Sequence, residues 1–71
     1  MSETCSTLID RIIALRKDSG MTQKELAEAA HLAQPAIARM ESKTATPQLD
    51  TLLKILAPMG KTLDVVPLKN K

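Results

Sequence analysis

The amino-acid sequence predicts a compact all-α domain of four to five helices with a short β-strand near its C-terminus. Three observations support this prediction. Apolar residues recur at helical spacings along most of the chain, glycine and proline interrupt them at short intervals, and a segment rich in β-branched residues follows the last interruption. A chain of 71 residues is sufficient for one domain, so residues 1–71 are expected to form a single unit.

The first helix is expected to begin at a cap provided by Ser6 or Thr7. Cys5 then precedes it, in a frayed N-terminus. The helix ends before Gly20, because glycine readily adopts the left-handed conformation that follows a helix. Its apolar face consists of Leu8, Ile9, Ile12, Ile13 and Leu15.

Two short helices joined by a tight turn are expected next. Thr22 caps the first of them, and Glu25 completes a capping box with Thr22. After a break at residues 31–33, the second begins near Gln34. Its inward-facing residues are Ile37 and Met40.

The fourth helix is expected to begin at Thr46 and Pro47, as cap and first helical position, and to stop at Pro58 and Gly60. A short fifth turn falls around Pro58. The apolar face of the fourth helix consists of Leu49, Leu52, Leu53 and Leu56.

Residues 61–68 have the composition of a short strand, bounded by Gly60 and Pro67. The rest of the chain offers no second strand, and an unpaired strand edge promotes aggregation. We therefore expect this strand to pair with the same strand of a second copy across a two-fold axis. The alternative is an extended tail that packs on the helices.

The composition excludes several classes of function. Cys5 and His31 are the only cysteine and histidine, too few for a Cys/His metal site, and we expect no metal or other cofactor. We expect no enzyme either, because the chain lacks a Ser/His/Asp set, a phosphate-binding loop and paired catalytic carboxylates. No run approaches the roughly 20 apolar residues of a membrane span. The polar, acidic N-terminus differs from the basic start of a secretory signal, so we expect a cytoplasmic protein.

The net charge of +2 is too small to indicate nucleic acid by itself. Aromatic residues are absent, which removes the stacking platforms of RNA-binding and single-strand-binding modules. Double-stranded DNA is compatible with this composition, because polar side chains read the grooves of a duplex without aromatic residues.

The helix pair within residues 22–41 has the pattern of a helix-turn-helix motif. Gln34 and Arg39, on the outer side of the second helix, suit adenine and guanine, and Pro35 and Ala36 can contact a thymine methyl group. The alternative is an ordinary helical hairpin within a bundle.

Four segments strengthen the DNA-binding interpretation. They are LR at 15–16, GMTQKELA at 20–27, QPAIARME at 34–41 and PQLDTLLK at 47–54. In the order and spacing of these segments, the chain resembles the phage-repressor and Cro-like family, also called the xenobiotic-response-element type, over residues 8–60. The resemblance implies a fold like that of the lambda repressor and binding to double-stranded DNA.

The resemblance also implies roles for individual residues. Gln23 matches a phosphate contact, Gln34 matches the first base-reading position, and Arg39 matches a further base or phosphate contact. Arg16 and Glu41 match an ion pair, which their positions beside core residues also favour. The positions implied to contact DNA are Gln23, Gln34, Pro35, Ala36, Arg39, Lys43 and Thr44.

Three residues depart from the family pattern. His31 and Lys43 stand where glycine is frequent, so both are expected in a backbone conformation that glycine favours. Ala33 stands where serine or threonine usually caps the recognition helix, and its methyl group accepts no hydrogen bond.

The C-terminal segment resembles that of HipB-like antitoxins, in which a strand pairs between the subunits of a dimer. Leu63, Val65 and Val66 would then form the dimer contact. The first functional hypothesis is a repressor that binds a palindromic operator as a homodimer. The second is an antitoxin that also binds a toxin protein, with Ile9 and Ile13 facing the toxin. Two other hypotheses are a DNA-binding subunit of a larger assembly and a module that has lost DNA binding.

Overall fold

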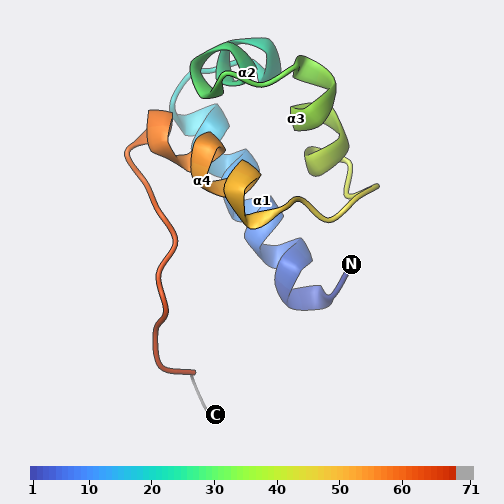
Figure 1. Ribbon diagram of the computed structural model, residues 1–71, viewed down its shortest axis with the longest axis vertical. Coiled ribbons are helices and arrows are strands. Elements are labelled where there is room, and N and C mark those ends of the chain that lie inside the picture. Colours follow the sequence, from blue (N-terminus) through green and yellow to red (C-terminus); the bar gives the residue numbers. More distant parts are fainter. Residues whose placement is uncertain (69–71) are drawn as a thin grey trace.

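The computed structural model describes residues 1–68. Within them the chain forms four α-helices and a final 3₁₀ helix (Figure 1). Helix α1 is the longest, and α2 and α3 follow it at one end of the molecule, joined by a short turn. The helices are α1 (Glu3–Asp18), α2 (Gln23–Ala30), α3 (Gln34–Glu41), α4 (Leu49–Leu56) and η1 (Ala57–Met59).

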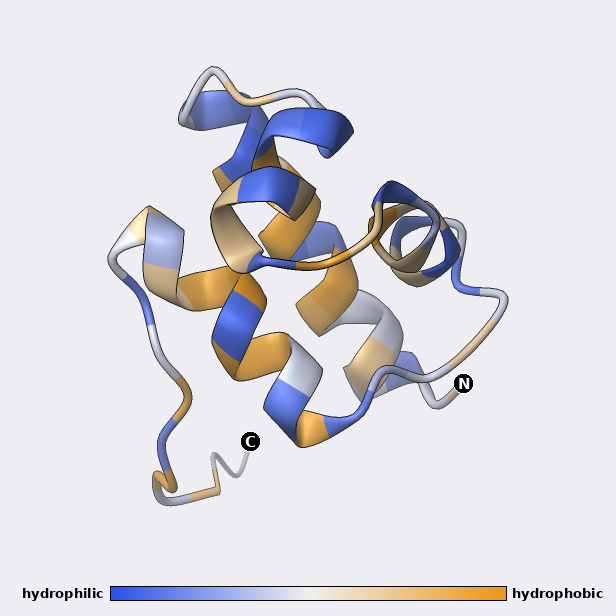
Figure 2. Ribbon diagram, turned by 45° about the horizontal axis from the view of Figure 1, so that its top comes forward, coloured by the Kyte–Doolittle hydropathy of each residue, from blue (hydrophilic) through white to orange (hydrophobic). Residues whose placement is uncertain are grey.

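The core is formed by apolar side chains from all four α-helices, and among the described residues no polar or charged residue is fully part of it. Figure 2 shows apolar segments of the helices gathered in the interior. Small residues of α2 let the neighbouring backbones approach closely, because Ala27 and Ala30 are both buried. The buried residues are Ile9, Ile12, Leu26, Ala27, Ala30, Ile37, Met40, Leu52, Ile55 and Leu56.

Helix α1 begins earlier than the sequence predicts. Ser2 is its N-cap, and the Ser2 hydroxyl accepts a hydrogen bond from the backbone N–H of Cys5 at 3.2 Å. The expected cap at Ser6 or Thr7 is therefore wrong, and Cys5 lies inside the helix rather than in a frayed end. The predicted end is correct, because Gly20 follows the helix with a φ of 73°.

Helix α4 begins later than predicted. Its N-cap is Gln48, so the expected start at Thr46 and Pro47 is wrong. The buried face also differs: Leu52, Ile55 and Leu56 point into the core. Leu49 and Leu53 remain 63% and 37% exposed, although both were expected to be buried.

Residues 61–68 leave η1 as an extended segment without regular secondary structure, on the side of the molecule opposite α3 (Figure 1). Leu63 packs partly on the core. Val65 and Val66 are 95% and 70% exposed. Strand pairing between two copies stays a prediction, because the hydrogen bonds between the two strands would form only with a second chain.

Candidate nucleic-acid interface

The start of α2 is fixed by the predicted capping box, which the structure confirms. The Thr22 hydroxyl accepts a hydrogen bond from the backbone N–H of Glu25 at 3.0 Å. In return, the Glu25 carboxylate accepts one from the backbone N–H of Thr22 at 2.8 Å. Two N–H groups that a helix start leaves unpaired are thus satisfied, so α2 has a defined first turn.

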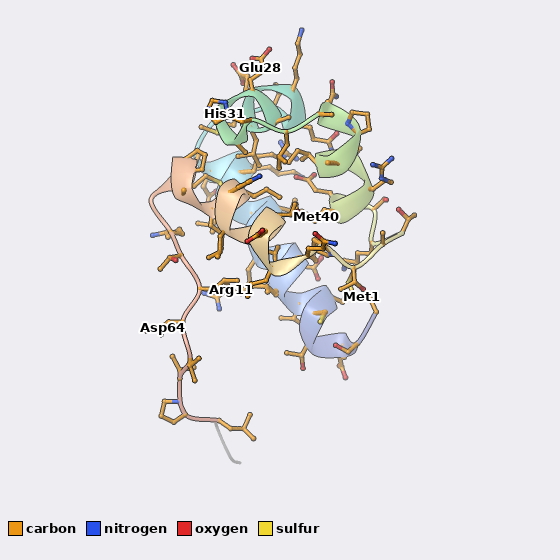
Figure 3. The ribbon with its side chains drawn as sticks, viewed as in Figure 1. Met1, Arg11, Glu28, His31, Met40 and Asp64 are labelled. Atoms are coloured by element: carbon orange, nitrogen blue, oxygen red, sulfur yellow. The ribbon has the colours of Figure 1, made fainter. Side chains whose placement is uncertain are left out.

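The turn between α2 and α3 depends on a left-handed residue. His31, at the C-terminal end of α2 (Figure 3), has φ 59° and ψ 42°. The backbone N–H of Leu32 then donates to the Ala27 carbonyl at 2.8 Å, which closes the helix end. His31 thus confirms the expectation of a backbone conformation that glycine usually adopts.

Helix α3 begins without a side-chain cap, as the sequence predicts. Ala33 occupies the N-cap position with an extended backbone, and no side chain accepts a hydrogen bond there. Pro35 follows in the first turn, where a missing N–H removes no helical hydrogen bond. The beginning of the helix therefore has few intramolecular partners.

The two sides of α3 differ in chemistry. Ile37 and Met40 are buried in the core, as expected. Gln34, Pro35 and Arg39 are exposed on the other side of the helix, while Ala36 is partly buried. Within residues 1–68, the side chains of Gln34 and Arg39 have no hydrogen-bond partner in the chain, so both are available to an external ligand.

Arg16 and Glu41 form the expected ion pair, which joins α1 to the end of α3. Arg16 Nε donates to Glu41 Oε2 at 2.6 Å, and Nη2 donates to Oε1 at 3.0 Å. The two side chains are only 11% and 8% exposed. A third donor, Arg16 Nη1, reaches the Met21 carbonyl at 2.8 Å. The guanidinium therefore links α1, the segment before α2, and α3.

Gln23 has an intramolecular partner that the sequence did not predict. Its Nε2 donates to Glu41 Oε1 at 3.0 Å, which ties the first residue of α2 to the last residue of α3. Gln23 and Glu41 are 18 positions apart, so no local pattern indicates the contact. The second N–H and the carbonyl oxygen of the Gln23 amide remain as hydrogen-bonding groups.

The charge of Glu41 follows from its partners. Burial raises the pKa of this carboxyl, but the hydrogen bonds from Arg16 and Gln23 lower it. The nearby positive charges of Arg16 and Lys17 lower it further. The net effect is a pKa below the ordinary value, so Glu41 is a carboxylate at neutral pH.

The loop after α3 contains a second left-handed residue. Lys43 has a φ of 62°, as its place in a glycine position predicts. The hydroxyls of Ser42 and Thr44 donate to the carbonyl of Arg39 at 3.1 and 3.3 Å and so hold the loop against the helix. Lys43 Nζ lies 2.7 Å from Oδ1 of Asp10 in α1, a contact that the sequence did not predict.

The described part of the chain shows neither a metal centre nor a membrane span. No three His, Cys, Asp or Glu side chains among residues 1–68 are grouped so that they could hold a metal ion. In the same residues, no helix combines the length and apolar character needed to cross a bilayer.

Comparison with known proteins identifies the family. A helix-turn-helix family model matches residues 12–66, and the chain belongs to the helix-turn-helix family. It is 50% identical over 64 residues to a protein of Haemophilus influenzae described as an uncharacterized HTH-type transcriptional regulator. That alignment covers 90% of this chain and 65% of the relative, so the chain spans just under two thirds of the relative's length.

A solved structure has the same fold. It is described as a toxin-antitoxin module from Streptococcus pneumoniae and is similar to this chain with a TM-score of 0.77 and 46% sequence identity. The likeness covers 94% of this chain and 74% of the other. Since it extends over nearly the whole chain, it includes α2, the turn and α3.

Proposed function

We propose that this protein is a sequence-specific regulator of transcription that binds double-stranded DNA. The observation that carries the proposal is the division of α3 into two sides. Ile37 and Met40 anchor the helix in the core, while Gln34, Pro35 and Arg39 face outward. A helix of this kind, braced by the one before it, can lie in the major groove with its N-terminal residues against base edges.

The exposed side chains have the chemistry of base recognition. A glutamine amide pairs bidentately with adenine, and an arginine guanidinium pairs bidentately with guanine. Gln34 and Arg39 are therefore the proposed readers. Pro35 and Ala36 have apolar surface that fits a thymine methyl group.

The remaining contacts of the proposal are to the DNA backbone. Gln23 still has one free amide N–H after its bond to Glu41, which suits a phosphate oxygen. Lys43 and Thr44 lie in the loop directly after α3, where a helix-turn-helix protein passes close to the phosphates. These contacts set the position of the domain on the duplex rather than its sequence preference.

The functional unit in this proposal is a cytoplasmic homodimer that represses transcription from a palindromic operator. One small domain with few readers binds weakly, and two domains related by a two-fold axis read two half-sites. The exposed Val65 and Val66, close to the exposed Leu68, support a contact between copies, because neighbouring apolar side chains on a surface can mark an interaction site. Leu63, the third predicted contact, packs partly on its own core.

The proposal is tested by selecting bound duplexes from a random DNA pool and measuring affinities for the selected site. Gln34→Ala and Arg39→Ala are each expected to cost about 1–3 kcal/mol on that site and to relax the preference at one base pair. Glu28→Ala, on the exposed side of α2, is the matched control and leaves affinity close to that of the wild type. Recovery of no enriched duplex, or unchanged binding by both reader variants, contradicts the proposal.

A second candidate function is that of an antitoxin, which regulates its own operon and also binds a toxin protein. The likeness to the toxin-antitoxin module of Streptococcus pneumoniae, at 46% identity, favours it. The expected toxin-facing role of Ile9 is wrong, because Ile9 is 1% exposed and belongs to the core, and Ile13 is partly buried. Co-expression with the product of a short neighbouring gene tests this function. Failure of the two proteins to co-purify contradicts it.

A further inference from the structure

The ion pair between Lys43 and Asp10 lies beside the proposed DNA-binding surface. Lys43 stands two residues after the end of α3, and its ammonium is 2.7 Å from the Asp10 carboxylate on α1. The side chains of Lys43 and Asp10 are 31% and 62% exposed. Solvent, and therefore an approaching phosphate, has access to both.

A carboxylate and a phosphate interact with a lysine ammonium in the same way. Each offers anionic oxygen atoms, and each accepts a short, charge-assisted hydrogen bond from an ammonium group. In the free protein, Asp10 already occupies one of the three donors of Lys43 and offsets its charge. A phosphate that approaches Lys43 also approaches the negative charge of Asp10, which repels it.

The fold does not depend on this ion pair to hold α1 against α3. The partly buried Arg16–Glu41 pair already makes that connection with two hydrogen bonds. Ion pairs between exposed side chains contribute little to stability. The Asp10–Lys43 pair is therefore free to have a role other than packing.

We propose that Asp10 competes with DNA phosphate for Lys43 and thereby weakens binding of the protein to all duplexes alike. This inference rests on the proposed function, since it requires Lys43 to contact DNA. Asp10 is then a residue that limits affinity without contacting a base. Gln34 and Arg39 set the sequence preference, and the charge of Asp10 lowers the affinity for the phosphate backbone of any duplex.

The first test is the variant Asp10→Asn, which keeps the shape of the side chain and removes its charge. We expect affinity to rise about three- to tenfold, and by the same factor for the selected site and for an unrelated duplex of equal length. The dependence of log affinity on log salt concentration is expected to become steeper, by up to about one released counterion. Fluorescence anisotropy at several salt concentrations measures both quantities.

The matched control is Asp18→Asn, which makes the same change of net charge on the same helix. Asp18 is exposed at the other end of α1 and has no salt-bridge partner among the described residues. Its replacement is expected to change affinity less than about twofold, because salt screens charges over about 10 Å. Circular dichroism on heating is expected to show that both variants keep the wild-type fold.

A double-mutant cycle separates competition for Lys43 from a general effect of charge. Lys43→Asn removes the ammonium, and asparagine tolerates the left-handed backbone at this position. In the Lys43→Asn background, Asp10→Asn is expected to give less than a twofold gain in affinity.

Two outcomes would overturn the inference. One is unchanged or weaker binding by Asp10→Asn, and the other is a gain in affinity that persists without Lys43. If the wild-type protein selects a site but Asp10→Asn shows no gain in affinity, only the inference about Asp10 is wrong. If the wild-type protein selects no duplex, the proposed function is wrong as well.

Discussion

Gln23 and Glu41 are joined by a hydrogen bond of 3.0 Å from Nε2 to Oε1, which ties the first residue of α2 to the last residue of α3. Arg16 donates two hydrogen bonds to the same carboxylate from α1. The Glu41 carboxylate of α3 therefore accepts hydrogen bonds from both α1 and α2, and so joins the three helices. The relative placement of α2 and α3 depends on this contact as well as on apolar packing.

The first prediction concerns the stability that Glu41 provides. Glu41→Ala leaves the guanidinium of Arg16 partly buried without a counter-charge. Loss of one partner of such a pair costs about 3–5 kcal/mol, so we expect a large decrease in the free energy of unfolding. Urea denaturation followed by circular dichroism measures it. A change below 1 kcal/mol, similar to that of the exposed control Glu28→Ala, would show that the pair is only a surface contact.

The second prediction concerns pH. The pKa of Glu41 is lower in the folded protein than its ordinary value of 4.5, so the unfolded chain binds the proton more tightly. The stabilisation is therefore fully present above pH 4.5 and is lost as pH falls through the lower pKa of the folded state. Urea midpoints measured from neutral pH down to acid are expected to show this loss in the wild type. In Glu41→Gln this component of the loss is absent; parallel curves for the two proteins would contradict the assignment.

The third prediction uses the uncapped start of α3. Ala33 has the extended backbone of an N-cap and lacks only an accepting side chain. Ala33→Ser is expected to stabilise the protein by about 1 kcal/mol. For a domain of this size, this corresponds to a rise in melting temperature of roughly 4–8 °C. Ala29→Ser, at an exposed position inside α2, is the control and is expected to lower the melting temperature slightly.

The fourth prediction is the converse change in α2. Thr22→Ala removes the hydroxyl that accepts the Glu25 N–H, and a loss of about 1 kcal/mol is expected. Thr22→Ser keeps the accepting oxygen and is expected to restore most of the stability. Equal melting temperatures for Thr22→Ala and Thr22→Ser would refute a role for the capping box.

The fifth prediction tests the proposed dimer contact. Deletion of residues 65–71 removes the exposed Val65 and Val66 but keeps Leu63, which packs on the core. We expect the truncated protein to fold and to dimerise more weakly, with a lower affinity for the selected site. Sedimentation analysis over a range of concentrations measures the association. An unchanged dimer would exclude strand pairing through this segment.

Features encoded within a few residues were predicted well from the sequence. The capping box of Thr22 and Glu25 depends on a spacing of three. The left-handed conformation of His31 and Lys43 was expected because the family resemblance places glycine at these two positions. The predicted positions of the N-caps of α1 and α4 were wrong. For α1, the residues Ser2, Ser6 and Thr7 all have an oxygen that can accept a capping hydrogen bond, so the local sequence does not choose among them. For α4, the N-cap Gln48 makes no side-chain capping bond, so no capping pattern marks the position.

The contacts between distant segments were harder to predict. The four leucines of α4 fit a helical stripe, yet so do Leu52, Ile55 and Leu56, and periodicity alone does not choose between the two sets. The partners of Gln23 and Lys43 lie on other helices, at separations that no local pattern indicates. The ion pair of Arg16 and Glu41 was expected because the family resemblance supplied the pairing, and the structure contains it.

The side chains of Gln34 and Arg39 make no intramolecular hydrogen bonds among the described residues, and this affects how the preferred DNA sequence can change. Both side chains are exposed, and within residues 1–68 neither takes part in a hydrogen bond that maintains the fold. Substitutions at these two positions are therefore expected to alter the preferred DNA sequence at little cost in stability, since exposed side chains that make no capping or ion-pair contact tolerate replacement. New operators become accessible by exchanging two side chains on a scaffold that stays the same.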